Sequence, residues 1–592
     1  MPTVRPTHRW RLPPPPDGSV GTLSRDLELP ELAVSLLLCR GYSSADDIRA
    51  FLDPSPARLR KPDLLPDIAK ATERVLAAID RHERVLVYGD YDVDGVTGTV
   101  LLVSTLSRLG ADVIYYLPLR TTEGYGFSAS GLDFAIAQGA KLIVTNDCGS
   151  SDHATLAAAA EAGIDVIVTD HHELAGAERT QKSETRNLDS EVPGPKSAMP
   201  LALVNPKRPD SKYPFRELAG VGVAFKLAWS VLSALKRPRE ELTTLLDLVG
   251  LGTIADVVPL VDENRVLARI GLNAIRRSPR PGLQALLRVA GIADRPLSGY
   301  SVGFMLGPRI NAAGRVGHAE LAARLLLTRD EAEAQVLADE LDRLNGSRQA
   351  LEEQILTQAT ALVESERLAE RRAMVVAGEG WHEGVIGIVA AKLVDRFSRP
   401  CIVVALRGGR GKGSGRSVTG FDLHAALSAC SGNLLAFGGH KYAAGLSLER
   451  DRLTAFSDAL ARYAAGFPEE VFAPTLHIDA VASMEQVDEA LVTAIERFEP
   501  FGPDNAEPLL VSHGVEVVGY PRKVGKNHLK LTVRAGERTL EAIAWGRSAE
   551  IVNVEVGTGS RLDICYTVGR RTYGGRTSTQ LTLRDFRTAE RP

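Results

Sequence analysis

Carboxylates stand directly after an apolar, strand-like segment of this 592-residue chain, at residues 84–90. Asp90, Asp92 and Asp94 occupy alternate positions there and precede a glycine. Three carboxylates this close cannot all be ionised unless a cation lies between them. An exposed acidic turn is the alternative for this motif alone. A calcium-binding EF-hand loop also begins in this way, but neither the glutamate at its twelfth position nor the preceding long helix is present.

Three other motifs add carboxylates and imidazoles to this group. Asp147 and the run Asp170-His171-His172 each follow an apolar segment, and Asp256 lies within an apolar stretch. Each motif alone also fits a structural role, as a turn or as a buried charge with a partner. We expect all four motifs to lie at strand ends, and this shared placement favours a common site. Carboxylates and histidine without cysteine suit Mn²⁺ or Mg²⁺, and two such ions are the usual arrangement for hydrolysing a phosphodiester.

The segments that must position these residues alternate between strand and helix signals. Val- and Ile-rich runs at 84–90, 111–118, 141–147 and 164–170 are typical of buried strands, and helical stretches separate them. This rhythm predicts the α/β class, with a parallel sheet that carries helices on both faces. Ligands of such sheets collect at the carboxyl ends of the strands, where the acidic residues fall.

The rest of the chain divides by pattern. A long connecting helix is expected from Asp330 to about residue 365, with Asn345-Gly346 as the place where it would kink. From about residue 474, apolar and polar residues alternate between Gly-rich turns, which favours a small β-barrel. We expect an N-terminal extension at 1–50, a first α/β domain at 51–275, a helical connector at 276–365, a second, smaller α/β domain at 366–468 and a barrel domain at 469–592.

Composition excludes several classes of protein. Hydrophobic residues make up 44% of the chain and charged residues 24%, as in soluble globular proteins, and no apolar run is long enough to span a membrane. The five cysteines form no CxxC pair and the first residues lack the apolar core of a secretory signal, so we expect a cytoplasmic protein. Net charge is −4, yet residues 521–592 carry 14 Lys and Arg against 7 Asp and Glu. A basic tail on an acidic body is compatible with nucleic-acid binding.

The acidic and histidine motifs, in this order, resemble the DHH phosphoesterase superfamily, named for Asp170-His171-His172. Further motifs resemble its RecJ family of single-strand-specific 5′→3′ exonucleases. The resemblance covers about residues 30–590 and implies a parallel-sheet DHH domain, a long connecting helix, a DHH-associated α/β domain and a C-terminal OB-type β-barrel. The further motifs are GPRINAAGR at 307–315, GWHEGVIG at 380–387, GSGRS at 413–417, GGH at 438–440 and PFGP at 500–503.

The resemblance also implies a role for each matching residue. The catalytic group would be Asp92, Asp94, Asp147 and His172, with His172 near the scissile phosphate. Two divalent cations, Mn²⁺ or Mg²⁺, would be bridged by Asp147, and their ligands would be Asp90, Asp92, Asp94, Asp147, His171 and Asp256. The substrate would be bound by Arg309, Asn311, Arg315, Trp381, His382, Ser414, Arg416, Gly439 and His440. Among these, Arg309, Ser414 and Arg416 match residues that hold a 5′-terminal phosphate, which a guanidinium grips through two oxygens.

Other residues carry weaker expectations. The rings of Trp381, Tyr442 and Phe501 could stack on bases, although ordinary packing is the alternative for each. The loop at 174–200 is longer and more charged than the resemblance leads us to expect, and its role is open. A set of cations among β-forming residues would follow phosphates along a barrel face, or else form a solvated edge. These are Arg522, Lys523, Lys526, Lys530 and Arg534.

Together these implications describe a two-metal exonuclease that degrades single-stranded DNA from its 5′ end, releases 5′-mononucleotides and serves DNA repair and recombination. A single-strand-binding protein and a helicase are the implied protein partners, and a monomer without membrane contact is expected. Two alternatives differ in class. A DHH-family phosphodiesterase of short oligonucleotides or cyclic dinucleotides would not need the basic β-rich tail. A non-catalytic single-strand-binding scaffold would lack motif carboxylates, and here they are all present.

Overall fold

The computed structural model describes residues 8–14, 18–174, 199–525, 527–546, 556–573 and 576–589. Most of the predicted charged loop, from 175 to 198, and the predicted phosphate contact Lys526 lie outside these residues. The chain forms two compact units, one of residues 56–472 and one of residues 1–55 together with 473–592. Across the described ranges, the helices are too short or too polar to cross a membrane.

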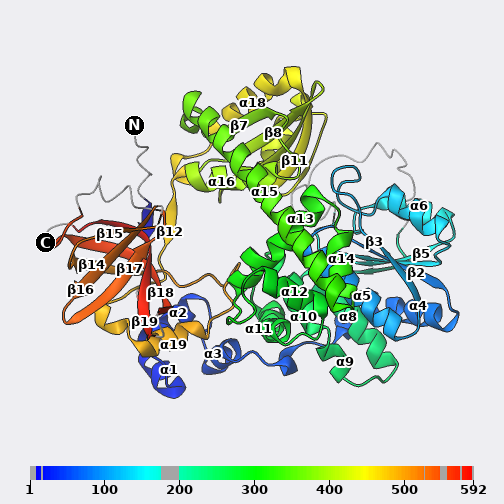
Figure 1. The fold of residues 1–592 in the computed structure, drawn as a ribbon, viewed down its shortest axis with the longest axis horizontal. Coiled ribbons are helices and arrows are strands. Elements are labelled where there is room, and N and C mark those ends of the chain that lie inside the picture. Colours follow the sequence, from blue (N-terminus) through cyan, green and yellow to red (C-terminus); the bar gives the residue numbers. More distant parts are fainter. Residues whose placement is uncertain are drawn as a thin grey trace, which may run out of the picture. The chain divides into compact units, whose positions relative to one another are not determined.

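The first sheet of the larger unit is parallel throughout, as its Val- and Ile-rich strands predict (Figure 1). The strand order is β3-β2-β4-β5-β6, so the chain leaves β2 toward β3 and returns to β4 on the other side of β2. This reversal makes the carboxyl ends of β2 and β4 the place where such a sheet binds ligands. The strands are β2 (Arg84–Gly89), β3 (Asp112–Tyr116), β4 (Leu142–Asn146), β5 (Asp165–Thr169) and β6 (Ala202–Val204).

Alternate residues of the inner strand β2 point into two separate apolar cores, which is why helices cover both faces of the sheet. Val85 and Val87 pack with α4, α5 and α8, whereas Leu86 and Tyr88 pack with α6 and α7. These helices are α4 (Ile68–Asp80), α5 (Val93–Arg108), α6 (Ala129–Ala137), α7 (His153–Glu161) and α8 (Gly220–Ala234).

Further helices extend the first of these cores and lead to the connecting helix. α10 and α11 cross so closely that a Cβ atom on Gly250 would lie 2.4 Å from the Cα atom of Gly271, so glycine is required there. A single π-helical turn, Ser301–Leu306, leads directly into α13. The helices are α9 (Glu240–Thr243), α10 (Leu246–Ala255), α11 (Asp262–Arg276), α12 (Pro281–Val289), α13 (Gly307–Val316), α14 (Glu320–Leu327) and α15 (Glu331–Ser365).

The connecting helix α15 runs without interruption through the pair at which we expected a kink. The Asn345 side chain accepts a hydrogen bond of 2.6 Å from Arg348, one turn further along, so it does not compete for the helix backbone. Arg348 also pairs with Glu352 at 2.5 Å, and Glu352 pairs with Lys392 of the following domain. This chain of contacts holds the helix together across Gly346.

The second α/β domain contains a mixed sheet in the order β10-β11-β9-β8-β7, in which only β7 and β8 are parallel. Helices α15 and α16 pack on one face of this sheet and α17 and α18 on the other. The elements are β7 (Met374–Glu379), α16 (Ile386–Phe397), β8 (Cys401–Arg407), β9 (Arg410–Arg416), α17 (Leu423–Ala429), β10 (Ala436–Gly439), β11 (Ala443–Glu449) and α18 (Leu453–Ala465).

The smaller unit contains the expected barrel. Its pairings run from β14 through β18, β19, β17 and β16 and return to β14, so five strands form a ring. Residues 18–55, most of which we expected to form a separate N-terminal extension, contribute three helices, and these pack into the core of the barrel. The ring strands are β14 (Leu510–Val517), β16 (His528–Ala535), β17 (Arg538–Ala544), β18 (Arg561–Tyr573) and β19 (Arg576–Thr588). The other elements are β1 (Arg9–Arg11), α1 (Val20–Leu27), α2 (Glu31–Cys39), α3 (Ala45–Leu52), β12 (Thr475–His477), β13 (Ala480–Val481), α19 (Glu489–Glu496) and β15 (Arg522–Val524).

Candidate active site

The first acidic motif joins the end of β2 to the start of α5. Asp92 is the N-cap of this helix, and its carboxylate accepts hydrogen bonds from the backbone N–H groups of Asp94 and Gly95 at 2.9 and 3.1 Å. A Cβ atom on Gly95 would lie 2.4 Å from the carbonyl oxygen of Asp90, so the turn requires glycine. Asp94 is fully buried and accepts hydrogen bonds from the first N–H groups of α8, at Gly220 and Val221. Two helix N-termini therefore hold this pair of carboxylates.

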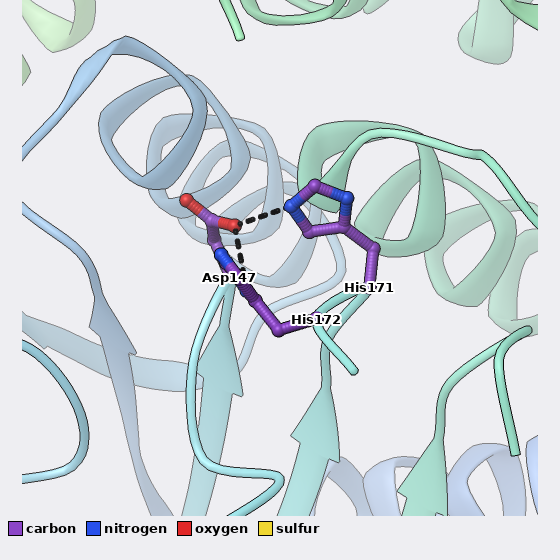
Figure 2. Close-up of side chains that lie close together, drawn as sticks. All are labelled: Asp147, His171 and His172. Atoms are coloured by element: carbon purple, nitrogen blue, oxygen red, sulfur yellow. Dashed lines mark ion pairs between the residues drawn. The ribbon is translucent and has the colours of Figure 1, made fainter. Parts of the chain in front are cut away.

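The ends of β4 and β5 bring the next two motifs to the same place. Asp147 follows β4 with a φ of 63°, a left-handed conformation that few residues other than glycine adopt. Figure 2 shows the imidazole of His171 pointing at this carboxylate, with Nε2 and Oδ1 3.1 Å apart. The Nδ1 atom of His172 lies 3.8 Å from the same oxygen. Asp147 is thus the carboxylate that both histidines face.

Asp256 joins the cluster from a helix, which corrects the expectation that all four motifs lie at strand ends. It is the C-cap of α10, and its Oδ2 atom lies 3.6 Å from Nε2 of His171. The residues before Asp256 are apolar because they belong to α10, a helix that is buried on nearly all sides. They do not form a strand. Three sets of side chains in this centre could each hold a metal ion, because the ligand atoms within each set lie within 4.8 Å of one another. The sets are Asp94, His171 and Asp256; Asp147, His171 and His172; and Asp90, Asp92 and Asp147.

The donor atoms of this cluster fit divalent cations. Asp90 Oδ1, Asp147 Oδ1, Asp256 Oδ2 and His171 Nε2 are buried and lack a hydrogen-bond partner among the described residues. Buried polar atoms are normally paired, so unpaired atoms that converge on one space point to a missing ligand. Their oxygen-rich composition with one imidazole suits Mn²⁺ or Mg²⁺. The observed atoms therefore fit the predicted cofactor.

Burial and mutual repulsion set the electrostatics of the cluster. Burial, and then the neighbouring carboxylates, raise the pKa of Asp147 and of Asp256 well above the usual range and raise that of Asp94 to about 7. Burial lowers the pKa of His171 to about 3, so this imidazole is neutral and can act as a ligand. The centre holds more negative charge than it can keep ionised without a cation.

His172 is held differently from His171. Its Nδ1 atom lies 2.9 Å from Oδ1 of Asp170 and 2.8 Å from the hydroxyl of Tyr125. Burial is the largest single influence and lowers the pKa of His172, but the hydrogen bond to Asp170 and the charges of Asp170, Asp92 and Asp90 together raise it above its usual value. The Tyr125 hydroxyl also donates to the backbone carbonyl of Asp147 at 3.1 Å. Tyr125 therefore ties the two parts of the centre together.

Arginines gather beside the acidic centre. Arg416 lies near Ser414 at the first turn of α16, where a Cβ atom on Gly387 would lie 2.9 Å from the Ser414 hydroxyl. Arg315 donates to the carbonyl of Gly384 at 3.0 Å. Burial, followed by the charge of Arg120, lowers the pKa of Arg315 to about 10. The same two causes lower the pKa of Arg416. Cations that repel one another at a helix N-terminus provide a binding site for an anion such as a phosphate.

The other predicted substrate residues divide into three kinds. Arg309 is held by the carbonyl of Met305 at 2.6 Å and by Asp342 at 2.9 Å, and Asn311 accepts from the backbone N–H of Val93, directly behind the acidic motif. His382 caps the loop before α16 by accepting from the N–H of Gly384. Gly439 and His440 are exposed at the end of β10, and Gly439 has a φ of 135°, which requires glycine.

The structure disagrees with the stacking role of Trp381. Its indole is 8% exposed, and its Nε1 atom donates to Gln358 of α15 at 2.7 Å. Base stacking needs an exposed ring face, so ordinary packing is the better interpretation. Tyr442 is 42% exposed, with the Lys441 ammonium 4.8 Å from its ring centroid, and Phe501 packs against the core of the smaller unit.

Sequence reasoning missed two residues of the centre. Arg120 follows β3, and its guanidinium lies over the ring of Tyr91, 4.8 Å from the ring centroid. Tyr91 stands between Asp90 and Asp92 in the sequence. A cation shortly after a predicted strand was a signal that could have identified Arg120. Tyr125 lies in a glycine-rich turn without any periodic pattern, so only the fold reveals its contact with His172.

A groove of about 770 Å³ adjoins Ser414. Its lining includes Gly438 of β10 and Gly445 of β11, which pair in register with each other and with Ser414 of β9, and it also includes Tyr125. Lys412 and Arg407 lie further along it. This volume is in the range of pockets that hold small molecules.

On the barrel, some of the cations predicted to contact phosphates already form ion pairs with neighbouring carboxylates. Lys530 pairs with Glu541 at 2.6 Å and Arg534 with Glu516 at 2.9 Å, whereas Arg522 and Lys523 are exposed on β15. Two aromatic side chains that the sequence reasoning did not single out are exposed nearby. Tyr520 is 86% exposed, and Trp545 is 54% exposed and packs edge-on against His528.

The fold and this centre define a class, the metal-dependent phosphoesterases of the DHH superfamily. The DHH family N-terminal domain matches residues 84–253, the DHHA1 domain matches residues 370–466 and the RecJ OB domain matches residues 478–585. The chain is 38% identical over 588 residues to the single-stranded-DNA-specific exonuclease RecJ of Bacillus subtilis, covering 98% of this chain and 71% of the relative. The chain belongs to the RecJ family.

Solved structures agree with this assignment. RecJ from Thermus thermophilus in complex with Mn²⁺ superimposes with a TM-score of 0.80 at 31% identity, covering 98% of this chain and 80% of that one. The same protein in complex with Mg²⁺ gives a TM-score of 0.74 at 30% identity, covering 98% and 79%. The expected α/β architecture with a C-terminal OB domain is therefore confirmed.

Proposed function

We propose that this protein is a single-stranded-DNA-specific exonuclease that hydrolyses phosphodiester bonds from the 5′ end and releases 5′-mononucleotides. One observation carries the proposal: an acidic centre with unpaired metal-binding atoms lies directly beside a cluster of arginines. The acidic centre and the arginine cluster are close enough to influence each other electrostatically. Arg120 lowers the pKa of Asp90, and Asp92 raises the pKa of Arg315. A strand whose 5′-terminal phosphate lies at the arginines would place a following phosphodiester at the acidic centre and would then be cut from its 5′ end.

Each residue of the centre has a distinct part in this mechanism. Two divalent cations, Mn²⁺ or Mg²⁺, would supply Lewis acidity and lower the pKa of the attacking water. Asp90, Asp92, Asp94, Asp147, His171 and Asp256 would hold them, with Asp147 shared. Asp170 orients the His172 imidazole through Nδ1, and the Tyr125 hydroxyl holds the same atom from the other side. Nε2 of His172 is then free to contact a phosphate oxygen.

The arginine site sets the direction of attack. Arg416, Ser414, Arg315 and Arg120 would bind the 5′-phosphate, because a dianionic terminus gains more from this cationic site than an internal phosphate does. Arg309, which the sequence resemblance assigned to the 5′-phosphate, is bound to Asp342 of α15, so we propose that it lines the path of the strand instead. Asn311, His382, Gly439 and His440 would line the same path. Asn311 and Arg309 are already fixed by backbone contacts, so they need no reordering when a substrate binds.

The barrel unit would add further contacts to the single strand. Exposed Arg522 and Lys523, with the rings of Tyr520 and Trp545, offer both phosphate and base contacts. A single-strand-binding protein and a helicase would act with it in DNA repair and recombination in the cytoplasm, and we propose a monomer. The boundaries 51–275, 366–468 and 469–592 remain our proposal for its DHH, DHH-associated and OB domains.

The test uses an internally labelled oligonucleotide, single-stranded or annealed to form a blunt duplex, with Mn²⁺ or with EDTA. We expect mononucleotide release only from the single strand and only with metal. Asp147→Asn should reduce the rate at least about 10³-fold while the melting temperature of the protein changes little, because it removes a shared metal ligand and leaves the volume unchanged. Asp133→Asn, on the exposed side of α6, is the matched control. Equal cleavage of the duplex, or full activity of Asp147→Asn, would refute the proposal.

A further inference from the structure

Two large rings are exposed on the π-helical turn that precedes α13. Tyr300 is 65% and Phe304 is 68% exposed, and their ring centroids lie 4.8 Å apart with an angle of 19° between the planes. Residues four apart on a helix share a face, so the rings form a stack of their own on the surface. Their turn is anchored from its other side by the fully buried side chains of Val302 and Leu306. The stack is thus held in place by the core without being part of it.

The exposure of these rings calls for an explanation. Large aromatic side chains usually contribute to cores or interfaces, and a cluster of them left in water is more informative than a single exposed residue. A third apolar side chain is also exposed close to the same segment in the fold. Val257 is 68% exposed and has a φ of 65°, an unusual conformation for a β-branched residue. It directly follows Asp256.

The segment that carries the aromatic stack leads into a helix that packs beside the last turn of α10. Gly307, at the start of α13, lies close enough to Ala255 that a Cβ atom on it would be 3.5 Å from the Ala255 Cβ atom. Arg309 donates to the carbonyl of Met305 within the same turn. The start of α13, three residues after Phe304, therefore lies near the end of α10, where Asp256 is the C-cap.

Helix α13 relates this stack to the arginine site. Tyr300 and Phe304 precede its first residue, and Arg315 lies near its end. Between them, Gly314 packs against the carbonyl of Tyr91 in the acidic motif, so the helix runs past the acidic centre. At a rise of 1.5 Å per residue, the two ends of this segment are roughly 15–20 Å apart.

We propose that Tyr300 and Phe304 form a stacking platform for bases of the single strand on the 3′ side of the scissile bond. This inference rests on the function proposed above. If the 5′-phosphate lies at the arginines, a strand that crosses the acidic centre and continues along α13 toward its first residue reaches the segment that carries the rings. From the span of α13, the platform meets about the third to the fifth nucleotide from the 5′ end, because stacked bases are spaced by about 3.4 Å and extended ones by more. Every base has a flat face, so the contact would not demand a sequence.

The experiment places one abasic site at successive positions of a 5′-phosphorylated oligonucleotide and measures kcat and KM for the first cleavage. In the wild-type protein, KM should rise about tenfold when the abasic site lies between the third and fifth positions, with kcat preserved. The variant Tyr300→Ala/Phe304→Ala should raise KM for the intact strand about tenfold to hundredfold and should no longer respond to the abasic site. Tyr300→Phe/Phe304→Tyr keeps both rings and should behave as wild type.

Ile136→Ala is the control for loss of exposed apolar surface, since Ile136 is 49% exposed on α6, on the opposite face of the parallel sheet. It should leave KM unchanged. A wild-type KM that does not depend on the abasic position would overturn the proposal without any variant. So would a double alanine variant that binds the intact strand normally, which would assign the rings to a protein partner. Absence of single-strand cleavage by the wild type would instead refute the function on which the inference rests.

Discussion

Asp256 places a carboxylate oxygen 3.6 Å from Nε2 of His171, and that oxygen has no hydrogen-bond donor among the described residues. Burial, followed by the charges of Asp94 and Asp92, raises its pKa. A group whose pKa is higher in the folded than in the unfolded protein favours folding at low pH, and this contribution is lost as pH rises through the folded pKa. In the metal-free protein near pH 8, Asp256 therefore opposes folding.

Asp256→Asn should consequently stabilise the metal-free protein while weakening its response to metal. We expect its free energy of unfolding in EDTA at pH 8 to rise by about 1 kcal/mol or more, since each unit of pKa shift corresponds to about 1.4 kcal/mol. The rise in melting temperature caused by Mn²⁺ should be smaller than in the wild type. Thermal unfolding with EDTA and with Mn²⁺ measures both quantities. A variant that is less stable in EDTA and responds normally to Mn²⁺ would show that Asp256 is not a ligand.

Arg416 tests the assigned polarity at the level of one side chain. Its guanidinium lies near Ser414 and the first turn of α16, so it should grip a terminal phosphate. Arg416→Ala should raise KM for a 5′-phosphorylated strand about tenfold to hundredfold, the usual effect of losing a charge-assisted contact, and should affect a 5′-hydroxyl strand much less. Steady-state kinetics on the two strands make the comparison. Equal losses on both strands would assign Arg416 to general strand binding.

At this scale the sequence predicted the acidic centre better than the substrate path. Three of its four motifs follow strands, and the pattern of a strand followed by carboxylates is visible without a structure. Trp381 shows the limit, because a tryptophan beside a glycine-rich motif is compatible with either stacking or packing. The contact of Trp381 with Gln358 spans 23 residues, and the contact of Tyr125 with His172 spans 47, so local patterns do not reveal either.

Helix α8 positions Asp94 through its first N–H groups, and a buried ion pair holds this helix in place. Lys226 of α8 is fully buried and lies 2.7 Å from Glu263 of α11, and it also donates to the carbonyl of Arg60 at 2.6 Å. The Tyr213 hydroxyl donates to the other oxygen of Glu263. Removing one partner of such a pair leaves an uncompensated buried charge.

Lys226→Met should therefore destabilise the protein by about 3–5 kcal/mol, whereas Lys70→Met on the exposed face of α4 should change stability by less than about 0.5 kcal/mol. Lys226→Met/Glu263→Gln should lose less than the single variant, because the buried charge is gone. Chemical unfolding of the three variants provides the free energies. A loss below about 1 kcal/mol for Lys226→Met would mean that the pair is not needed to hold α8.

Elements with a strong internal pattern were predictable, and those fixed by distant partners were not. The strands of the parallel sheet and the extent of α15 follow from apolar runs and helix-forming residues, whereas the continuity of α15 through Asn345-Gly346 does not, because it depends on the contacts of Arg348. The three-residue strand β6 forms only because β5 offers an edge to pair with. Asp256 was expected at a strand end because a buried helix such as α10 has the same apolar composition as a buried strand.

The chain's first residues and its last section form one folded unit. Leu32, Leu36 and Leu37 of α2 share a core with Leu491 of α19 and Leu510 of β14. Sequence patterns alone suggested a separate N-terminal extension, because no local signal links residue 32 with residue 491. A deletion that removes only the barrel would therefore expose the apolar face of α2.

The fragment 56–472 should retain the chemistry and lose affinity for long strands. We expect its kcat on a short 5′-phosphorylated oligonucleotide to stay within about threefold of the full chain. Its KM for a long strand should rise about tenfold or more, because the stacking and phosphate contacts of the barrel are lost. Gel filtration should show the fragment 56–472 as monodisperse, whereas a fragment 1–472 should aggregate. Unchanged KM on long strands would show that the barrel does not bind the substrate.

The central claim, a metal-dependent exonuclease that starts at the 5′ end, is tested most directly by blocking one end of the strand at a time. One oligonucleotide carries streptavidin on a 5′-biotin and another carries it on a 3′-biotin, and both are incubated with the protein and Mn²⁺. The account predicts mononucleotide release from the strand blocked at its 3′ end and none from the strand blocked at its 5′ end. Degradation of the 5′-blocked strand at an equal rate would contradict it, because the arginine cluster beside the acidic centre would then not be a site for the 5′-terminal phosphate.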